Sequence, residues 1–189
     1  LSGIEVEANY LINENWSVNA SGVMATNEFT DACEAAITIG DYGYAPTHTV
    51  AADGVLFDCV DMNGNTIPFV PDNTLSLGAT YSTDFDSGWD MRANISTFWQ
   101  SEVYRDAVNS MWLGSVSTVR ASLLISNGDN IEISIYGNNL TDEDQPREIT
   151  WRDDDYNICG STINCTESNF RLDGLRTPRE IGARITYRF

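Results

Sequence analysis

The sequence ends Pro178-Arg179-Glu180-Ile181-Gly182-Ala183-Arg184-Ile185-Thr186-Tyr187-Arg188-Phe189, a stretch in which apolar and polar residues alternate. Side chains point to opposite faces along a β-strand, so this segment has one apolar face and one face of charged or small residues. An apolar strand face meets either a protein core or lipid. Because the stretch stops on an aromatic residue with no polar tail, it predicts the closing strand of a transmembrane β-barrel.

The same alternation recurs along the chain and predicts an all-β, antiparallel fold of about seven strands. Arg120 and Glu132 lie inside such segments, which excludes a dry core on their face and favours a wet lumen. The predicted strands are 1–12, 15–28, 72–83, 88–104, 114–126, 129–139 and 178–189. The residues predicted to face lipid are Ile4, Val6, Leu75, Leu77, Ile95, Leu123, Ile133, Ile135 and Ile185. Those predicted to face the lumen are Glu5, Arg92, Arg120, Glu132 and Arg184.

The composition of the 189 residues is that of an acidic chain, with 42% hydrophobic residues and a formal net charge of −18. No apolar run approaches the roughly 18 residues that a membrane-spanning helix needs. This criterion does not detect barrel strands, because every second residue of such a strand faces water. The acidity also argues against a nucleic-acid partner, since phosphate backbones are bound by clustered Lys and Arg.

The predicted connections alternate between short and long. Short turns fall near 13–15, 83–88 and 126–129, and long loops near 29–71, 101–114 and 140–177. Outer-membrane barrels show this asymmetry, with short periplasmic turns and long external loops. Aromatic residues beside the short turns match an interfacial girdle, although edge aromatics of a secreted β-sandwich would look similar. These aromatics are Tyr10, Trp16, Tyr81, Trp89, Tyr187 and Phe189.

The predicted number of strands is odd, whereas a closed antiparallel bacterial barrel has an even number. We therefore expect the C-terminal part of a larger barrel, with residues 1–189 forming one barrel segment. The chain opens in a predicted strand at Leu1 and shows no signal peptide, so we expect the true N-terminus upstream.

Four motifs together resemble TonB-dependent outer-membrane receptors. Asn138-Asn139-Leu140-Thr141-Asp142-Glu143 is similar to the Asn-Leu-Phe/Thr-Asp motif near the end of those proteins. Pro178-Arg179-Glu180-Ile181-Gly182 with the closing Tyr-Arg-Phe resembles their final strand. Val70-Pro71-Asp72-Asn73-Thr74-Leu75-Ser76-Leu77-Gly78 and Gly3-Ile4-Glu5-Val6-Glu7 resemble two earlier strand starts. The matches span nearly the whole chain.

The resemblance implies a barrel of about twenty-two strands around an N-terminal plug in the outer membrane of a Gram-negative bacterium. It further implies energised uptake of a scarce, bulky solute, such as a ferric siderophore, cobalamin or an oligosaccharide. TonB would bind through the plug, which these residues do not show, so we expect it upstream. The other implied partners are outer-membrane lipid, lipopolysaccharide and the assembly machinery, which would recognise Tyr187 and Phe189. The alternative is a small outer-membrane barrel or a secreted β-sandwich with a binding or structural role.

The four cysteines lie in two predicted loops, and an oxidising envelope would favour disulfides. Three pairings exist, of which Cys33–Cys59 and Cys159–Cys165 need the fewest topological assumptions. A zinc site is the competing interpretation, but close Cys-x-x-Cys spacing is missing and His48 is the single histidine.

Enzymatic chemistry finds little support, and we expect neither an enzyme nor a cofactor or metal site. His48 lies in a loop without a nucleophile motif, so a solvated histidine is the simpler account. Asp153-Asp154-Asp155 lacks the spacing of a calcium loop and is better explained as a solvated acidic segment.

Ligand contact is therefore expected from the long loops, where aromatic and cationic side chains gather. Aromatic rings suit sugars or catecholates, and arginines suit anionic chelates. The competing explanation places the same aromatics in the outer interfacial belt of the barrel. The candidates are Tyr104, Arg105, Trp112, Arg147, Trp151 and Arg152.

Overall fold

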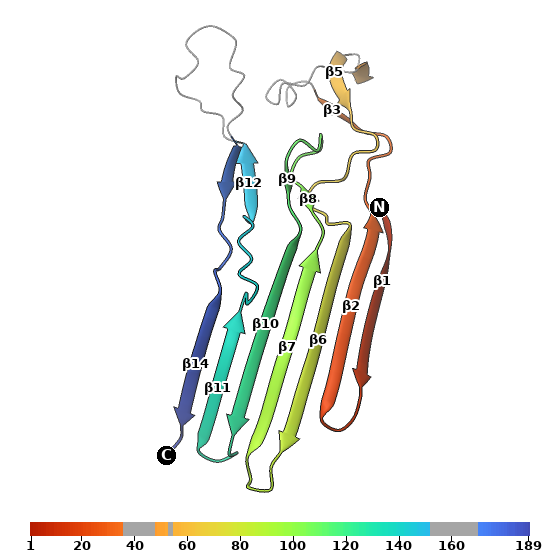
Figure 1. Cartoon of the computed structure of the whole chain (residues 1–189). Helices are drawn as coiled ribbons and strands as arrows, with labels where there is room; N and C mark the ends of the chain where they lie inside the picture. Colours follow the sequence, from red (N-terminus) through yellow and green to blue (C-terminus); the bar gives the residue numbers. More distant parts are fainter. Residues whose placement is uncertain (36–47, 53–54, 152–169) are drawn as a thin grey trace, which may run out of the picture.

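The computed structural model describes residues 1–35, 48–52, 55–151 and 170–189. One antiparallel sheet of seven strands dominates it, and the strands stand side by side in the order in which they occur in the chain. Long connections leave one end of this sheet and short turns close the other, so we name these the long-loop end and the short-turn end (Figure 1). The strands are β1 Ser2–Leu11, β2 Trp16–Thr26, β6 Asn73–Asp84, β7 Asp90–Gln100, β10 Val116–Ser126, β11 Ile131–Asn138 and β14 Glu180–Tyr187.

The prediction of seven strands in an antiparallel sheet is confirmed, with ends that shift by at most four residues. The largest shift is in β7, which ends at Gln100 rather than at residue 104. There the backbone N–H of Ser101 donates to the Asn73 carbonyl (2.9 Å), and its Oγ accepts from the Asn73 N–H (3.1 Å). After this contact the chain leaves the sheet and forms β8, Val103–Tyr104, in a separate two-stranded sheet.

The short turns follow from local side-chain and backbone chemistry. Asn13 Oδ1 accepts hydrogen bonds from the backbone N–H groups of Asn15 and Trp16, both at 2.9 Å. Gly88 and Gly128 have positive φ angles of 79° and 77°, which residues with a side chain rarely adopt. These turns fix the register of each hairpin and thereby decide which residues share a face.

The register gathers the apolar side chains on one face of the sheet across all seven strands. Leu77, for example, lies opposite Ala20 and Thr97, whereas Ser76 lies opposite Ser21 and Phe98. All nine residues predicted to face lipid fall on this apolar face, and the five predicted to face a lumen fall on the other, polar face. Many apolar-face side chains are exposed, including Ile4, Leu77, Ile95 and Ile185.

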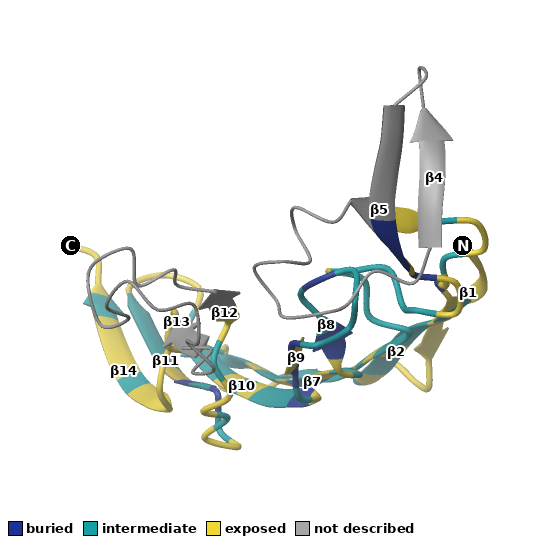
Figure 2. Cartoon of the chain, turned by 90° about the horizontal axis from the view of Figure 1, so that it is seen from above, coloured by how far each residue is buried: buried dark blue, intermediate teal, exposed yellow. Residues whose placement is uncertain are grey.

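The sheet bends into an arc, and β8 lies over its concave side (Figure 2). Val116 belongs to a row of the polar face and is only 2% exposed, at the place where the loops cover the sheet. The polar face is therefore the concave one. Within the described residues no second sheet covers the apolar face, so a β-sandwich does not describe this fold. The described part also contains no helix long and apolar enough to cross a membrane.

Short strands in the long connections were not predicted from the sequence. A three-stranded sheet contains β3 Cys33–Ala35, β5 Val55–Asp61 and β4 His48–Ala52, in that order. Two further pairs are β8 with β9, Trp112–Leu113, and β12, Glu148–Trp151, with β13, Phe170–Asp173. Nearly all buried apolar residues of the described chain belong to these connections. They are Cys59, Val60, Met62, Val103, Met111 and Leu113, together with Val116 at the start of β10.

Candidate functional site

The polar face carries two neighbouring hollows toward the long-loop end of the sheet. Their volumes are about 470 Å³ and 320 Å³, and both are lined by Phe98, Thr118 and Arg120. Phe98 on β7 lies directly opposite Thr118 on β10, and Ser96 lies opposite Arg120, so the strand register places these side chains together. The smaller hollow is otherwise lined mainly by hydroxyl and amide residues of β2, β6 and β7.

The larger hollow gathers three arginines, and we call it the arginine hollow. Arg120 comes from β10, Arg147 precedes β12, and Arg176 precedes β14, with Glu180 as the one acidic residue in the lining. The Nε atom of Arg176 is buried and has no hydrogen-bond partner among the described residues. All ten cationic side chains of this chain are arginines, whose planar guanidinium groups bind carboxylates and phosphates through paired hydrogen bonds. The arginine hollow can therefore hold an anionic group.

A tight turn after β11 shapes one wall of the arginine hollow. Asn139 adopts φ 49° and is 8% exposed; its Nδ2 donates to the carbonyls of Glu143 (2.9 Å) and Thr177 (3.0 Å). Its Oδ1 accepts from the Glu143 N–H at 2.8 Å, and Glu143 Oε2 accepts from the Ser117 N–H at 3.0 Å. These bonds join the end of β11 to β10 and to the segment that enters β14. The motif 138–143 thus has a structural role beside the hollow.

Two long connections fold against each other above β6 and β7. We call residues 27–35, 59–72 and 101–116 the loop unit. Asn109 joins them because its Oδ1 accepts from the Thr66 N–H (2.7 Å) and its Nδ2 donates to the Thr66 carbonyl (2.8 Å). Asn65 Nδ2 also donates to the carbonyl of Ala107 at 3.0 Å. These side-chain amides act together with the backbone hydrogen bond from the Phe69 N–H to the Tyr104 carbonyl.

A buried carboxylate organises the second connection of the loop unit. Asp106 is 8% exposed and accepts three hydrogen bonds, from the Ser110 N–H (3.1 Å), the Ser110 Oγ–H (2.6 Å) and the Met111 N–H (2.8 Å).

The predicted disulfide Cys33–Cys59 is present and ties down the first connection, with Cα atoms 5.7 Å apart. The other predicted pair, Cys159–Cys165, lies outside the described residues.

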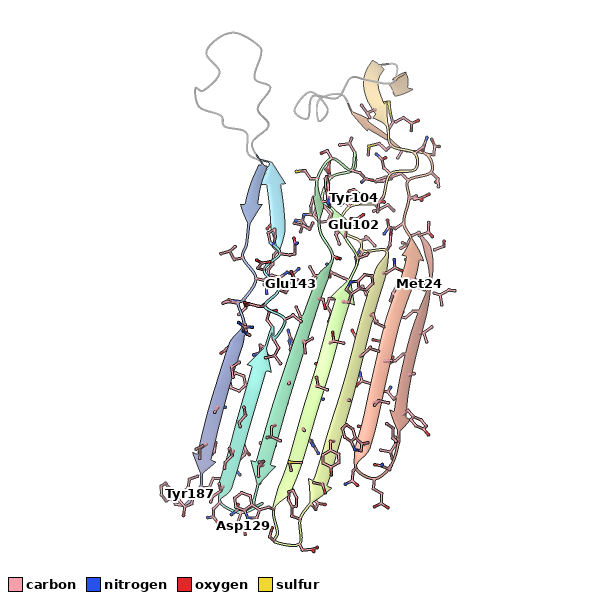
Figure 3. All side chains as sticks on the ribbon, in the orientation of Figure 1. Met24, Glu102, Tyr104, Asp129, Glu143 and Tyr187 are labelled. Carbon is pink, nitrogen blue, oxygen red and sulfur yellow. A yellow bond between two sulfur atoms is a disulfide. The ribbon has the colours of Figure 1, made fainter. Side chains whose placement is uncertain are left out.

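The structure describes the side chains of four of the six loop residues that the sequence singled out as ligand contacts. Arg147 is exposed and lines the arginine hollow, whereas Tyr104 and Trp112 pair with each other in the β8–β9 sheet. Tyr104 stands at the long-loop end, close to Glu102 (Figure 3). The side chain of Trp151 and all of Arg152 lie outside the described residues. A shared ligand site for the whole set stays a prediction.

Arg105 makes contacts within the protein that the sequence did not indicate. Its guanidinium carbon lies 4.3 Å from the centroid of the Phe69 ring, and its Nη2 lies 3.2 Å from Glu148 Oε1. The Arg105 side chain is only 16% exposed. Phe69 itself is 60% exposed and adopts φ 67°, held by its N–H donating to the Tyr104 carbonyl at 2.8 Å. Arg105 therefore links three long connections.

The predicted aromatic girdle lies at the short-turn end. The rings of Trp16 and Tyr81 have centroids 4.9 Å apart, and Tyr187 meets Phe189 edge-on at 5.1 Å. Tyr187 lies at the lower end of β14, at the level of the turn that carries Asp129 (Figure 3). Aromatic rings at one level of an apolar face are typical of a membrane–water boundary.

Family models were compared with the sequence, and the model described as TonB dependent receptor-like, beta-barrel, matches residues 1–140. The chain belongs to the TonB-dependent receptor β-barrel family. Members of this family are receptors of the Gram-negative outer membrane. The resemblance found in the sequence and the predicted barrel fold class are confirmed. The apolar, exposed face and the polar, concave face are those of such a barrel wall.

Two solved receptors share the fold of this barrel segment. The ferric yersiniabactin uptake receptor FyuA from Yersinia pestis is 19% identical with a TM-score of 0.63, and the match covers 99% of this chain and 23% of that one. The siderophore receptor PiuA from Acinetobacter baumannii is 22% identical with a TM-score of 0.55, covering 76% and 18% of the two chains. This chain thus spans less than a quarter of the length of either receptor. No curated protein matches the sequence.

Several residues that line the arginine hollow were not singled out for ligand contact from the sequence. Arg176 and Phe98 were missed, and Arg120 was predicted to face the lumen but was given no binding role. The alternation of β7 and β10 indicates the faces of Phe98 and Arg120. No local sequence pattern indicates that Arg176, which lies outside any strand, also lines the arginine hollow.

Proposed function

We propose that this chain forms part of the wall of an outer-membrane receptor for the energised uptake of a bulky, anionic solute, a ferric siderophore or a similar chelate. The observation that carries this proposal is the arginine hollow on the polar face. Three of its lining side chains are cationic in a chain with a net charge of −18, and one is acidic. The siderophore receptors that share the fold are consistent with this class of solute.

In the proposed arrangement the long-loop end faces the outside of the cell and the polar face lines the lumen. Short periplasmic turns and long external loops are the rule for outer-membrane barrels. A solute that enters from the long-loop end would then meet the loop unit first and the arginine hollow below it. Arg120, Arg147 and Arg176 would bind its anionic groups, and the neighbouring Phe98 ring offers an apolar contact.

The proposed partners follow from the family. A plug domain elsewhere in the full-length receptor would bind TonB, and TonB would couple release of the solute to the inner-membrane proton gradient. The assembly machinery would recognise the last strand through Tyr187 and Phe189, which stand together at the short-turn end. The Tyr187 ring with its hydroxyl and the apolar Phe189 ring also suit the inner headgroup boundary.

The experiment that tests the proposed solute class is binding of a ferric siderophore to the purified full-length receptor. Removing a charged hydrogen-bond donor from a binding site costs about 1.5–3 kcal/mol, roughly tenfold to a hundredfold in affinity. We expect a loss of this size for Arg120→Ala and Arg176→Ala. Arg92→Ala is the matched control, because Arg92 lies on the same polar face near the short-turn end, opposite Leu124.

Uptake into cells provides the second part of the test. We expect labelled ferric siderophore to accumulate in cells that carry the receptor, and accumulation to stop when the proton gradient is collapsed. Equal affinity of Arg120→Ala, Arg92→Ala and the unaltered receptor would contradict the role of the arginine hollow. Uptake that survives collapse of the gradient would contradict energised transport.

A further inference from the structure

The apolar face also carries a hollow, which we call the lipid hollow. Its volume is about 370 Å³, and its lining is almost entirely apolar. The floor consists of small residues, Ala79 on β6, Ala93 on β7, Ala121 on β10 and Gly137 on β11. Because these side chains barely project from the sheet, the face is recessed where they lie next to one another.

Branched side chains form the walls of the lipid hollow. The strand register sets Ile95 between Ala79 and Ala121 in one row of the face, and Gly137 lies opposite Ile181 at the end of that row. Ile95 is 53% exposed and Ile181 is 70% exposed, so these side chains stand away from the sheet. The hollow is thus a built feature of alternating large and small residues.

The two ends of the lipid hollow differ in chemistry. At one end Trp16 and Tyr81 pair with their ring centroids 4.9 Å apart, and they carry an indole N–H and a hydroxyl. At the other end lie Leu140 and Ile181, which carry no polar side-chain atom. Leu140 folds back onto the sheet, so that a Cβ on Gly137 would come within 2.6 Å of Leu140 Cδ2. An occupant would therefore be polar at one end only.

We propose that the lipid hollow binds one acyl chain of a phospholipid whose headgroup lies at Trp16 and Tyr81. Water would fill the hollow poorly, because a stable internal water needs two to four polar partners. The hollow continues the exposed apolar face, which in this family lies in the outer membrane. A flexible hydrocarbon chain can adapt its shape to the recess between Ile95, Leu123 and Ile135. A rigid protein surface would need a ridge of complementary shape to do so.

The position of the aromatic pair indicates which leaflet of the membrane holds the headgroup of the bound lipid. Trp and Tyr rings sit at the headgroup level of a bilayer, with the ring in hydrocarbon and the polar atom toward water. Trp16 begins β2 at the short-turn end, and Tyr81 lies directly opposite it. The headgroup is therefore placed in the leaflet on the short-turn side, and the acyl chain extends from there toward Leu140 and Ile181.

The test uses the full-length receptor in vesicles that contain phosphatidylethanolamine with a photoactivatable diazirine on one acyl chain. After irradiation the labelled peptides are mapped by mass spectrometry. We expect peptides from β7, β10 and β11 around Ala93, Ala121 and Ile135 to be labelled several-fold more than peptides from β1. Ala121→Leu fills the floor of the hollow and should reduce this labelling to the level of β1.

The control is Ala8→Leu, which adds the same side chain to the same apolar face on β1, opposite Ala20 and outside the hollow. It should leave the labelling pattern unchanged. Equal labelling of β1 and β10 in the unaltered receptor would overturn the proposal in favour of ordinary annular lipid. Cross-linking of a second polypeptide to the hollow would overturn it in favour of a protein partner.

If Ala121→Leu does not assemble, as judged by heat-modifiable migration on a gel, Trp16→Leu provides the second variant. It keeps an apolar side chain at the rim but removes the indole N–H, so labelling around Ala121 should fall while the barrel stays folded. Unchanged labelling in Trp16→Leu would contradict the placement of the headgroup. Solute binding at the arginine hollow is not part of either readout, so this test and that of uptake can fail independently.

Discussion

The seven-stranded sheet and the loop unit bury their residues in opposite ways. The sheet leaves large apolar side chains such as Ile4 and Ile185 exposed on one face, whereas the loop unit encloses Met62 and Met111 almost completely. Burial of apolar surface drives folding in water, so the loop unit is stabilised as a small water-soluble protein would be. The sheet has its apolar side chains on the outside and depends on lipid to cover them. One chain therefore contains a region whose apolar side chains are buried within the protein and a region whose apolar side chains face outward.

The two regions also differ in what joins their segments. Backbone ladders between neighbouring strands hold the sheet together. In the loop unit, side chains add to the backbone hydrogen bonds, through the Asn109–Thr66 pair, the Asp106 carboxylate and the Cys33–Cys59 disulfide. Substitutions should therefore affect one region and spare the other.

The largest expected effect is that of Met62→Ala in the loop unit. Met62 is 2% exposed, and truncating a buried methionine leaves a cavity that costs about 2–5 kcal/mol. We expect faster hydrogen exchange and proteolysis of residues 59–72, with unchanged heat-modifiable migration of the barrel. Met24→Ala is the control, because Met24 is 71% exposed on the sheet. Equal protection of the loop unit in the two variants would contradict the existence of its separate core.

A charge on the apolar face should be next in size. We expect Ile133→Lys to destabilise the barrel by about 2–4 kcal/mol if residue 133 lies near the bilayer midplane. Ser134→Lys, one residue further along β11, places the same charge on the polar face opposite Arg184 and should cost far less. Urea unfolding of the two full-length variants in lipid vesicles measures the difference. Similar unfolding midpoints would contradict the assignment of the faces.

Asp106→Ala should have an intermediate effect that is confined to the loop unit. Hydrogen bonds to a charged acceptor contribute about 1.5–3 kcal/mol, and this substitution leaves the Ser110 and Met111 N–H groups without their acceptor. Faster hydrogen exchange should appear over residues 101–116. Asp129→Ala, in the exposed turn between β10 and β11, should leave the exchange of that segment unchanged. Global unfolding of the Asp106 variant would show that the two regions are not independent.

The smallest effect is expected for the ion pair between Arg105 and Glu148. The Glu148 side chain is 52% exposed, and ion pairs at such sites contribute about 0.2–1 kcal/mol. A double-mutant cycle with Arg105→Gln and Glu148→Gln should give a coupling energy in this range, read from hydrogen exchange of the loop unit. A coupling above 2 kcal/mol would mean that the third connection is as firmly joined as the first two.

The comparison also explains what could be predicted from the sequence. Alternation along a strand is a local signal, and the lipid-facing set from Ile4 to Ile185 follows directly from it. The loop unit depends on contacts such as Asn109 with Thr66, which are 43 residues apart in the chain. Neither residue shows, from the sequence around it, which residue its side chain contacts. The loop unit was therefore predicted as loops without strands or a core.

The candidate ligand surface was predicted only in part for the same reason. Arg147 was singled out and does line the arginine hollow, but Arg176 joins it through a return of the chain that no periodicity indicates. Arg105 was chosen for its charge, yet its side chain contacts Phe69 and Glu148. Charge alone does not separate an arginine that can bind a solute from one that ties loops together.

The most direct test of the central claim is the accessibility of spin labels on adjacent residues of β7 and on adjacent residues of β11. Labels at Ile95 and Ile135 on the apolar face, and at Ser96 and Ser134 on the polar face, would be placed in the full-length receptor in lipid vesicles. Membrane-dissolved oxygen should reach the first pair better, and a water-soluble nickel chelate should reach the second pair better. Equal access of both reagents to all four positions would contradict the account of a sheet with one face in lipid and one in water.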